Sequence, residues 1–165
     1  MSETLTHIGQ DGKAHMVDVG DKDITVRTAV AEGRVRVSPE LAARIDANDL
    51  KKGNLLDIAR ISGIQAAKRT WELIPLCHNL PLDKVGVEAW LDGEFVRIRA
   101  MAKTTARTGV EMEALTAVSV AALTIVDMGK AIDQGMIIEG IRLVEKTGGR
   151  RGHYVAPDLD QATES

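Results

Sequence analysis

The sequence predicts an α+β fold in which an antiparallel sheet carries its helices on one face. Two segments of alternating apolar residues, 85–91 and 96–102, flank Asp92-Gly93 and have the pattern of a β-hairpin. A long segment that is apolar almost all round, 110–128, follows as a buried helix. The elements are predicted in the order strand, helices, strand, strand, helix, strand. That order is the split βαβ, or ferredoxin-like, arrangement.

The chain before the hairpin is predicted to begin with a strand and a short helix. Over residues 24–37 apolar and polar side chains alternate, which predicts the strand, with Gly33 as a bulge or turn. Ser38 can cap the free amides of a helix, and Pro39 loses no hydrogen bond at the first helical position. We therefore expect a helix over residues 39–47.

The remaining elements follow from the same rules. Apolar residues at helical spacing predict a second helix over residues 54–73, which Pro75 ends. After the hairpin and the long helix at 110–128, a last strand is predicted over 136–146. A basic, glycine-rich loop follows over 147–152.

The length of 165 residues, with 44% hydrophobic and 27% charged residues, indicates a single globular domain. We expect a flexible arm over 1–20, a folded core over 24–152 and an acidic tail over 156–165. No apolar run approaches the roughly 20 residues that span a bilayer, and the first ten residues do not resemble a secretory signal, so we expect a soluble, cytoplasmic protein. The single cysteine, Cys77, excludes an internal disulfide and a multi-thiolate metal site.

The net charge of -3 conceals a basic middle, because residues 26–155 contain 19 bases against 16 acids. From charge alone, a solvated mixed surface is the simpler interpretation. The acidic balance argues against a DNA-coating protein, and an aromatic content of 2% is too low for a platform that stacks bases. Standard phosphate-binding motifs are absent, so any phosphorylated ligand depends on basic side chains.

Two short segments carry polar groups beside helix ends. The loop 76–79 lies between Pro75 and Pro81 and presents Cys77 and His78, although an ordinary proline turn explains it equally well. The other histidines lack zinc-ligand spacing, so we predict no metal site. In the second segment, Lys51-Lys52-Gly53 precedes a helix, where a lysine can meet an anion that also contacts the helix amides.

The long apolar helix has acids at both ends. Glu111 and Glu113 lie in its first turn, where the helix dipole favours carboxylates, but they point to different sides, so at least one faces an interface or a pocket. Asp127 and Lys130 are adjacent at i,i+3, and an acid at a helix C-terminus opposes the dipole. Such a pair can divide base and acid roles.

Glu113 and Asp127 are 14 residues apart, or about 21 Å along a straight helix, so they cannot both touch one small reacting centre. Either a long ligand bridges them or two subunits contribute to one site. The apolar character of the helix favours two subunits, because a face that the sheet does not cover needs a partner.

Four segments of the chain resemble the MoaC family of molybdenum cofactor biosynthesis. These are LTHIGQDGKAHMVDV, ARISGIQAAKRTWELIPLCHNLPL, TGVEMEALTAVSVAALTIVDMGKA and RLVEKTGG. The resemblance implies a ferredoxin-like subunit in a hexamer, a trimer of dimers, with active sites at the dimer interface. It also implies an enzyme that converts 3′,8-cyclo-7,8-dihydro-GTP to cyclic pyranopterin monophosphate with release of diphosphate and without an organic cofactor.

The resemblance also implies site residues. Those for substrate binding are Leu76, Cys77, His78, Met112, Glu113, Glu111 and Arg27. The catalytic residues are Asp127, Lys130 and Lys52. We expect Asp127 and Lys130 to exchange protons with the substrate. Lys52 and Arg27, with His78, would hold the triphosphate, while Glu113 would accept hydrogen bonds from the guanine-type edge.

Two other functions remain as alternatives. The βαββαβ order also occurs in RNA-recognition modules, but the hairpin offers only Trp90 and Phe95 for stacking, so we expect no nucleic-acid partner. A ferredoxin-like regulatory module would bind guanine nucleotides without consuming them. Detection of diphosphate release separates that module from an enzyme.

Overall fold

The computed structural model describes residues 12–150 and 152–157. Residues 1–11 of the predicted arm and 158–165 of the predicted tail lie outside the described residues. The elements are β1 (Thr25–Arg36), α1 (Pro39–Asp46), α2 (Leu55–Ala67), α3 (Thr70–Leu73), β2 (Leu82–Asp92), β3 (Phe95–Ala106), α4 (Glu111–Gly129), β4 (Ile137–Thr147) and β5 (Tyr154–Val155).

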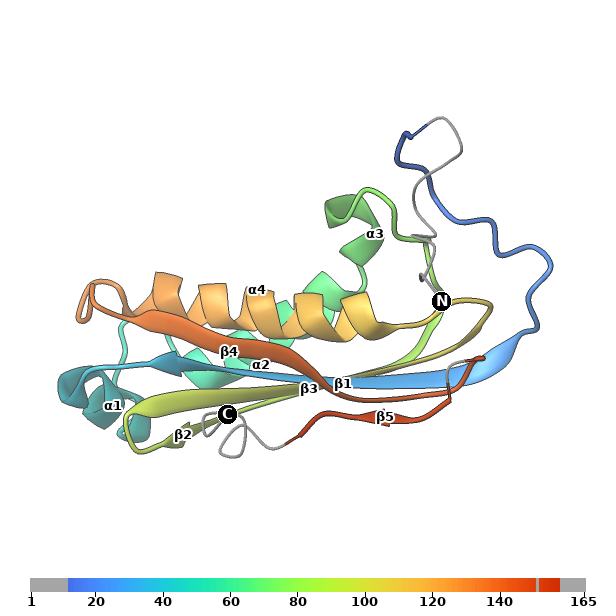
Figure 1. Cartoon of the computed structure of the whole chain (residues 1–165). Coiled ribbons are helices and arrows are strands. Elements are labelled where there is room, and N and C mark those ends of the chain that lie inside the picture. Colours follow the sequence, from blue (N-terminus) through green and yellow to red (C-terminus); the bar gives the residue numbers. More distant parts are fainter. Residues whose placement is uncertain (1–11, 151, 158–165) are drawn as a thin grey trace.

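The strands form one antiparallel sheet in the order β2-β3-β1-β4-β5, with α2 and α4 along one face (Figure 1). β1 and β2 run in the same direction with β3 between them, and β3 and β4 run in the same direction with β1 between them. Both helical connections are therefore split by an intervening strand. The predicted α+β class, with helices on one face of an antiparallel sheet, is confirmed, and this strand order is compatible with the ferredoxin-like arrangement.

The core lies between the sheet and α4, which packs against β1 and α2. Small residues allow this close approach. A Cβ atom at Gly33 of β1 would lie 2.8 Å from Val118 Cγ1, and one at Gly63 of α2 would lie 2.8 Å from the Ala117 carbonyl oxygen. Real Cβ atoms do not approach neighbours so closely. The two glycines therefore allow the short distances between α4 and β1 and between α4 and α2.

Most of the predicted elements are confirmed. Ser38 caps α1 by accepting a hydrogen bond from the Leu41 amide at 3.2 Å. The hairpin strands and the long helix form as expected, and the register of β1 with β4 shifts between Glu32 and Arg34, at the irregularity predicted for Gly33. The short strand β5, which pairs with the end of β4, was not predicted.

The single helix predicted over 54–73 is wrong. The chain leaves helical geometry at Arg69, whose φ and ψ are -116° and 11°, and divides into α2 and α3. The Thr70 hydroxyl donates to the carbonyl oxygens of Ala66 and Ala67 at 3.4 and 3.1 Å. The Thr70 hydroxyl thus adds to the Arg69 amide at the Ala66 carbonyl and contacts the Ala67 carbonyl at the end of α2.

By length and composition, α4 is the one helix within residues 12–150 and 152–157 that could cross a membrane. The expectation that no apolar run approaches that length is therefore wrong for α4. However, 56% of the tested segment is buried inside the fold, against the sheet and α2. This packing is that of a core helix.

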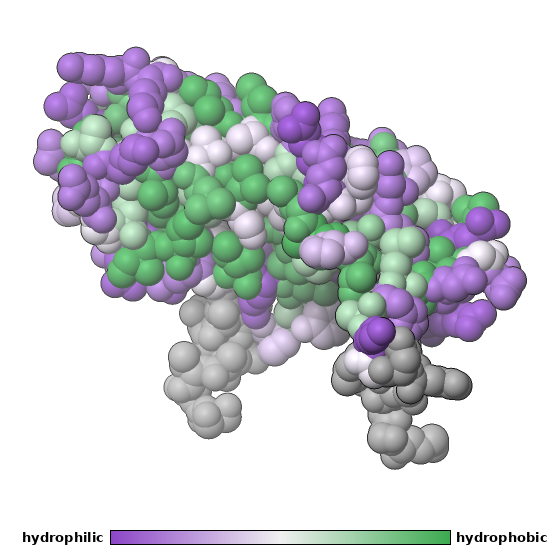
Figure 2. Space-filling view, turned by 90° about the horizontal axis from the view of Figure 1, so that it is seen from above, coloured by the Kyte–Doolittle hydropathy of each residue, from purple (hydrophilic) through white to green (hydrophobic). Residues whose placement is uncertain are grey.

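Figure 2 shows apolar side chains gathered over the middle of the helical face. The large exposed ones on the helices are Ile58, Ile61, Trp71, Leu73, Met112 and Leu123, which we call the helix-face patch. The opposite face of the sheet carries ion pairs such as Arg142 with Glu32 at 2.8 Å and Arg34 with Glu139 at 3.3 Å. On α4 itself, Met112 and Leu123 are the large apolar side chains that remain exposed.

Candidate active site

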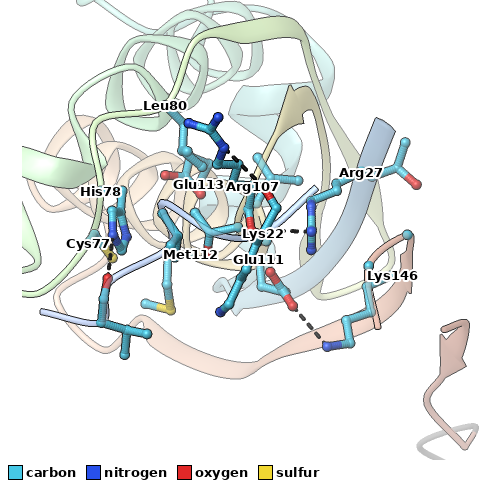
Figure 3. Close-up of a pocket in the computed structure, with 18 of the residues that line it drawn as sticks. Lys22, Arg27, Cys77, His78, Leu80, Arg107, Glu111, Met112, Glu113 and Lys146 are labelled. Atoms are coloured by element: carbon cyan, nitrogen blue, oxygen red, sulfur yellow. Dashed lines mark hydrogen bonds and ion pairs between the residues drawn. The ribbon is translucent and has the colours of Figure 1, made fainter. Parts of the chain in front are cut away.

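A pocket of about 550 Å³ opens at the end of the sheet where β1 and α4 begin (Figure 3). Five separate segments line it, and each enters from an element boundary at this end. They are residues 17–22 before β1, 27–28 near its start, 76–80 between α3 and β2, 107–113 from the end of β3 into the first turn of α4, and 146–150 at the end of β4. The fold thus brings segments that are far apart in the sequence together around one pocket.

The first turn of α4 contributes to the pocket wall. Val110 precedes the helix, and its apolar side chain makes no capping hydrogen bond to the first amides. These amides and the helix dipole give the N-terminus of α4 a partial positive charge. An anionic group of a ligand is therefore favoured at this end of the pocket.

The pocket is rich in cations. The described residues that line it include five basic side chains, Lys22, Arg27, Arg107, Lys146 and Arg150, against two acidic ones, Glu111 and Glu113. Lys146 is paired with Glu111, with Nζ to Oε1 at 3.0 Å. Arg107 donates from Nε to the Lys22 carbonyl at 3.1 Å, which ties the segment before β1 to the pocket. The surplus of positive charge suits a polyphosphate.

The carboxyl group of Glu113 is unusual because the residue is only 4% exposed. Burial raises its pKa most, its own backbone amide lowers it and the charge of Glu111 raises it, and together these effects bring the pKa to about 7. Near neutral pH, Glu113 therefore exists in both protonation states. It can accept a hydrogen bond as a carboxylate or donate one as an acid.

The 76–80 loop places Cys77 and His78 beside Glu113 (Figure 3). Burial, followed by the charge of Glu113, raises the pKa of the Cys77 thiol. The thiol therefore stays protonated, and we assign it to packing or hydrogen bonding rather than to nucleophilic attack. His78 Nε2 donates to the Val17 carbonyl at 2.9 Å. This bond fixes the imidazole orientation and holds the segment before β1 against the pocket.

A second polar cluster lies at the other end of α4. Lys130 Nζ is 2.7 Å from Asp127 Oδ1, and Lys52 Nζ is 3.3 Å from Oδ2 and 2.8 Å from the Asp127 carbonyl oxygen. Hydrogen bonds from Lys130 and then Lys52 lower the pKa of Asp127. All three side chains are at least half exposed. We call this group the Asp127 cluster.

The structure thus divides the sequence-predicted site residues into two groups. The pocket unites Arg27, Leu76, Cys77, His78, Glu111, Met112 and Glu113, while Lys52, Asp127 and Lys130 form the Asp127 cluster and do not line the pocket. This separation agrees with the distance expected along α4. The structure assigns no roles, so the catalytic and binding assignments stay predictions.

Several pocket residues were missed by sequence reasoning, namely Lys22, Arg107, Lys146, Gly148, Gly149 and Arg150. For Gly148, Gly149 and Arg150 the available signal was the basic, glycine-rich loop over 147–152, to which sequence reasoning gave no role. The loop after β4 lies beside β1 because β4 pairs with β1, with Thr147 opposite Thr28. Local sequence patterns do not report that pairing.

The pKa of Glu113 predicts how its replacement affects stability. A carboxyl group whose pKa rises on folding stabilises the fold below its unfolded pKa of about 4.5, and this stabilisation is lost as the pH rises through about 7. We expect Glu113→Gln to increase the free energy of unfolding, relative to wild type, more at pH 8 than at pH 5. The difference is about 3 kcal/mol at most.

Urea denaturation at the two pH values measures this effect. Glu88→Gln, at an exposed position of β2, is the control and is expected to follow wild type at both pH values. An equal effect of Glu113→Gln at pH 5 and pH 8 would show that Glu113 does not titrate abnormally.

Comparisons with known proteins give a consistent result. Residues 16–149 match the MoaC family. A protein of Roseiflexus sp. (strain RS-1) named cyclic pyranopterin monophosphate synthase is 59% identical over 153 residues, which cover 92% of this chain and 97% of the relative. A protein of the same name from Dinoroseobacter shibae is 54% identical over 154 residues, which cover 92% of this chain and 98% of the relative.

Proposed function

The chain belongs to the MoaC family, and on this premise we propose that it is a cyclic pyranopterin monophosphate synthase, a lyase of molybdenum cofactor biosynthesis. Its substrate would be 3′,8-cyclo-7,8-dihydro-GTP, and its products cyclic pyranopterin monophosphate and diphosphate. The observation that carries this proposal is the pocket at the start of α4, which joins a surplus of cations to one buried carboxyl group.

The two ends of the substrate match different parts of the pocket. Arg27 and the other basic side chains would bind the triphosphate and stabilise the charge of the departing diphosphate. Glu113 would face the N–H donors of the guanine-derived ring, with His78 and Met112 beside it. A regulatory module could bind the same nucleotide, but it would not need the Asp127 cluster.

The Asp127 cluster would supply the proton transfers. Asp127 is held as a carboxylate between two ammonium groups, so it can take a proton from the substrate while Lys130 or Lys52 gives one. Ring opening and ring closure both require such exchanges. Because the cluster does not line the pocket of its own chain, we place it in the site of a second subunit.

The helix-face patch supports this composite site. Leu123 is 58% exposed on α4, between the pocket residues at the helix start and Asp127 near its end. If two α4 helices pack antiparallel around a two-fold axis near Val120, the pocket of one subunit meets the Asp127 cluster of its partner. The pairing also covers apolar surface that one chain leaves exposed. Three such dimers would form the proposed hexamer.

The test is incubation of the purified protein with the cyclised nucleotide, followed by mass spectrometry and an assay for diphosphate. We expect cyclic pyranopterin monophosphate and diphosphate to appear in equal amounts. Binding of the nucleotide without release of diphosphate would instead favour the regulatory module.

A further inference from the structure

The orientation of Arg27 depends on main-chain groups. Its side chain projects from β1 on the same face as Ala29 and Ala31, which are buried under α4, but lies beyond the start of that helix. Nε donates to the Ala106 carbonyl at 3.1 Å, and Nη2 donates to the Arg107 carbonyl at 3.3 Å. Two backbone oxygens therefore hold one side of the guanidinium group.

The other side of the guanidinium lies against the loop after β4. Gly149 has a φ of +78°, and a Cβ atom there would lie 2.3 Å from Arg27 Nη1 and 3.0 Å from its Cζ. At Gly148 the obstacle is different, because a Cβ atom would lie 2.3 Å from the Val26 carbonyl oxygen. Gly148 thus makes room for backbone, whereas Gly149 makes room for the functional group of Arg27.

We propose that Gly149 is a positioning residue for substrate binding, because its missing side chain leaves the space in which the Arg27 guanidinium is held toward the pocket. This inference rests on the proposed function of Arg27 as a ligand of the triphosphate. A methyl group at position 149 meets the mobile end of a side chain, so the arginine moves and the fold persists. Arg27 then loses its hydrogen bonds to the carbonyl oxygens of Ala106 and Arg107, and the guanidinium charge moves out of the site.

Gly152 provides a matched control in the same loop. It has a φ of +66°, close to that of Gly149, and no described atom lies within 4 Å of its Cβ position. Its amide closes the turn with the Gly149 carbonyl at 3.2 Å, a bond that alanine preserves. Gly149→Ala and Gly152→Ala therefore impose similar backbone strain, but only the first displaces Arg27.

The experiment is a double-mutant cycle with two measurements. Inorganic triphosphate is titrated calorimetrically into wild type, Gly149→Ala, Gly152→Ala, Arg27→Ala and the Arg27→Ala/Gly149→Ala double variant. KM and kcat are measured with the cyclised nucleotide, and thermal melting confirms folding. We expect Gly149→Ala to weaken triphosphate binding and raise KM about tenfold, the loss of one charge-assisted contact, and to lower kcat no more than Arg27→Ala does. Gly152→Ala should stay within about twofold of wild type, as for a surface change remote from the site.

The cycle distinguishes positioning from general damage. If Gly149 acts through Arg27, Gly149→Ala has no further effect in the Arg27→Ala background. Equal effects of Gly149→Ala and Gly152→Ala, additive effects with Arg27→Ala, or an Arg27→Ala variant that binds triphosphate normally would each overturn the inference. Normal binding by Arg27→Ala would also remove the proposed role of Arg27, whereas the other two outcomes concern Gly149 alone. The proposed enzymatic activity is tested separately by the wild-type turnover assay.

Discussion

Asp127→Asn and Lys52→Ala are each expected to lower kcat by about 10²–10⁴-fold, the usual contribution of a general acid or base. Asparagine keeps the size of aspartate but cannot exchange a proton, and alanine removes the Lys52 ammonium that lies 3.3 Å from Asp127 Oδ2. Both side chains are at least half exposed, so the fold should remain. Steady-state rates with the cyclised nucleotide measure the loss, and thermal melting and size-exclusion chromatography confirm folding and assembly.

Matched controls lie close by in the chain. Asp57 is an exposed aspartate paired with a base three residues later, Arg60 at 3.0 Å, as Asp127 is paired with Lys130. Asp57→Asn removes the same kind of ion pair away from the proposed site, and Lys51→Ala removes the lysine next to Lys52. Both controls should retain nearly full activity. An Asp127→Asn variant that works as well as Asp57→Asn would exclude the proposed proton transfers.

Mixing two inactive variants is expected to restore about one quarter of the wild-type activity, because sites are shared between subunits. Glu113→Ala damages the pocket, and Asp127→Asn damages the cluster at the other end of α4. In a mixed dimer one composite site carries both defects and the other carries neither. Random pairing puts half of the subunits in mixed dimers, so one site in four is intact. The variants are unfolded and refolded together, and diphosphate release is measured.

A second mixture tests whether the restored activity comes from sharing. Glu113→Ala and His78→Ala both damage the pocket, so each composite site in their mixed dimer keeps one defect. This mixture should stay inactive. If the Glu113→Ala and Asp127→Asn mixture shows no more activity than its components, the site is not shared in the way proposed.

The structure also shows where sequence reasoning reached its limit. The hairpin about Asp92-Gly93 and the start of α1 at Ser38 are encoded by local patterns, and both were predicted correctly. The break between α2 and α3 was missed because the apolar spacing continues through it. At the break, the Thr70 hydroxyl donates to the carbonyl oxygens of Ala66 and Ala67. A pattern of apolar and polar side chains does not show that a hydroxyl group hydrogen-bonds to backbone carbonyl oxygens.

The α+β class, the order of the four long strands and the main helices, and the family could all be read from the sequence, because periodicity, caps and motifs are properties of neighbouring residues. The sequence also separated Glu113 from Asp127, since the rise of a helix follows from residue count alone. That Lys22, Arg107 and Lys146 share one pocket with Arg27 became visible in the folded chain alone. Their segments are distant in the chain, and only the pairing of strands and the packing of α4 bring their charges together.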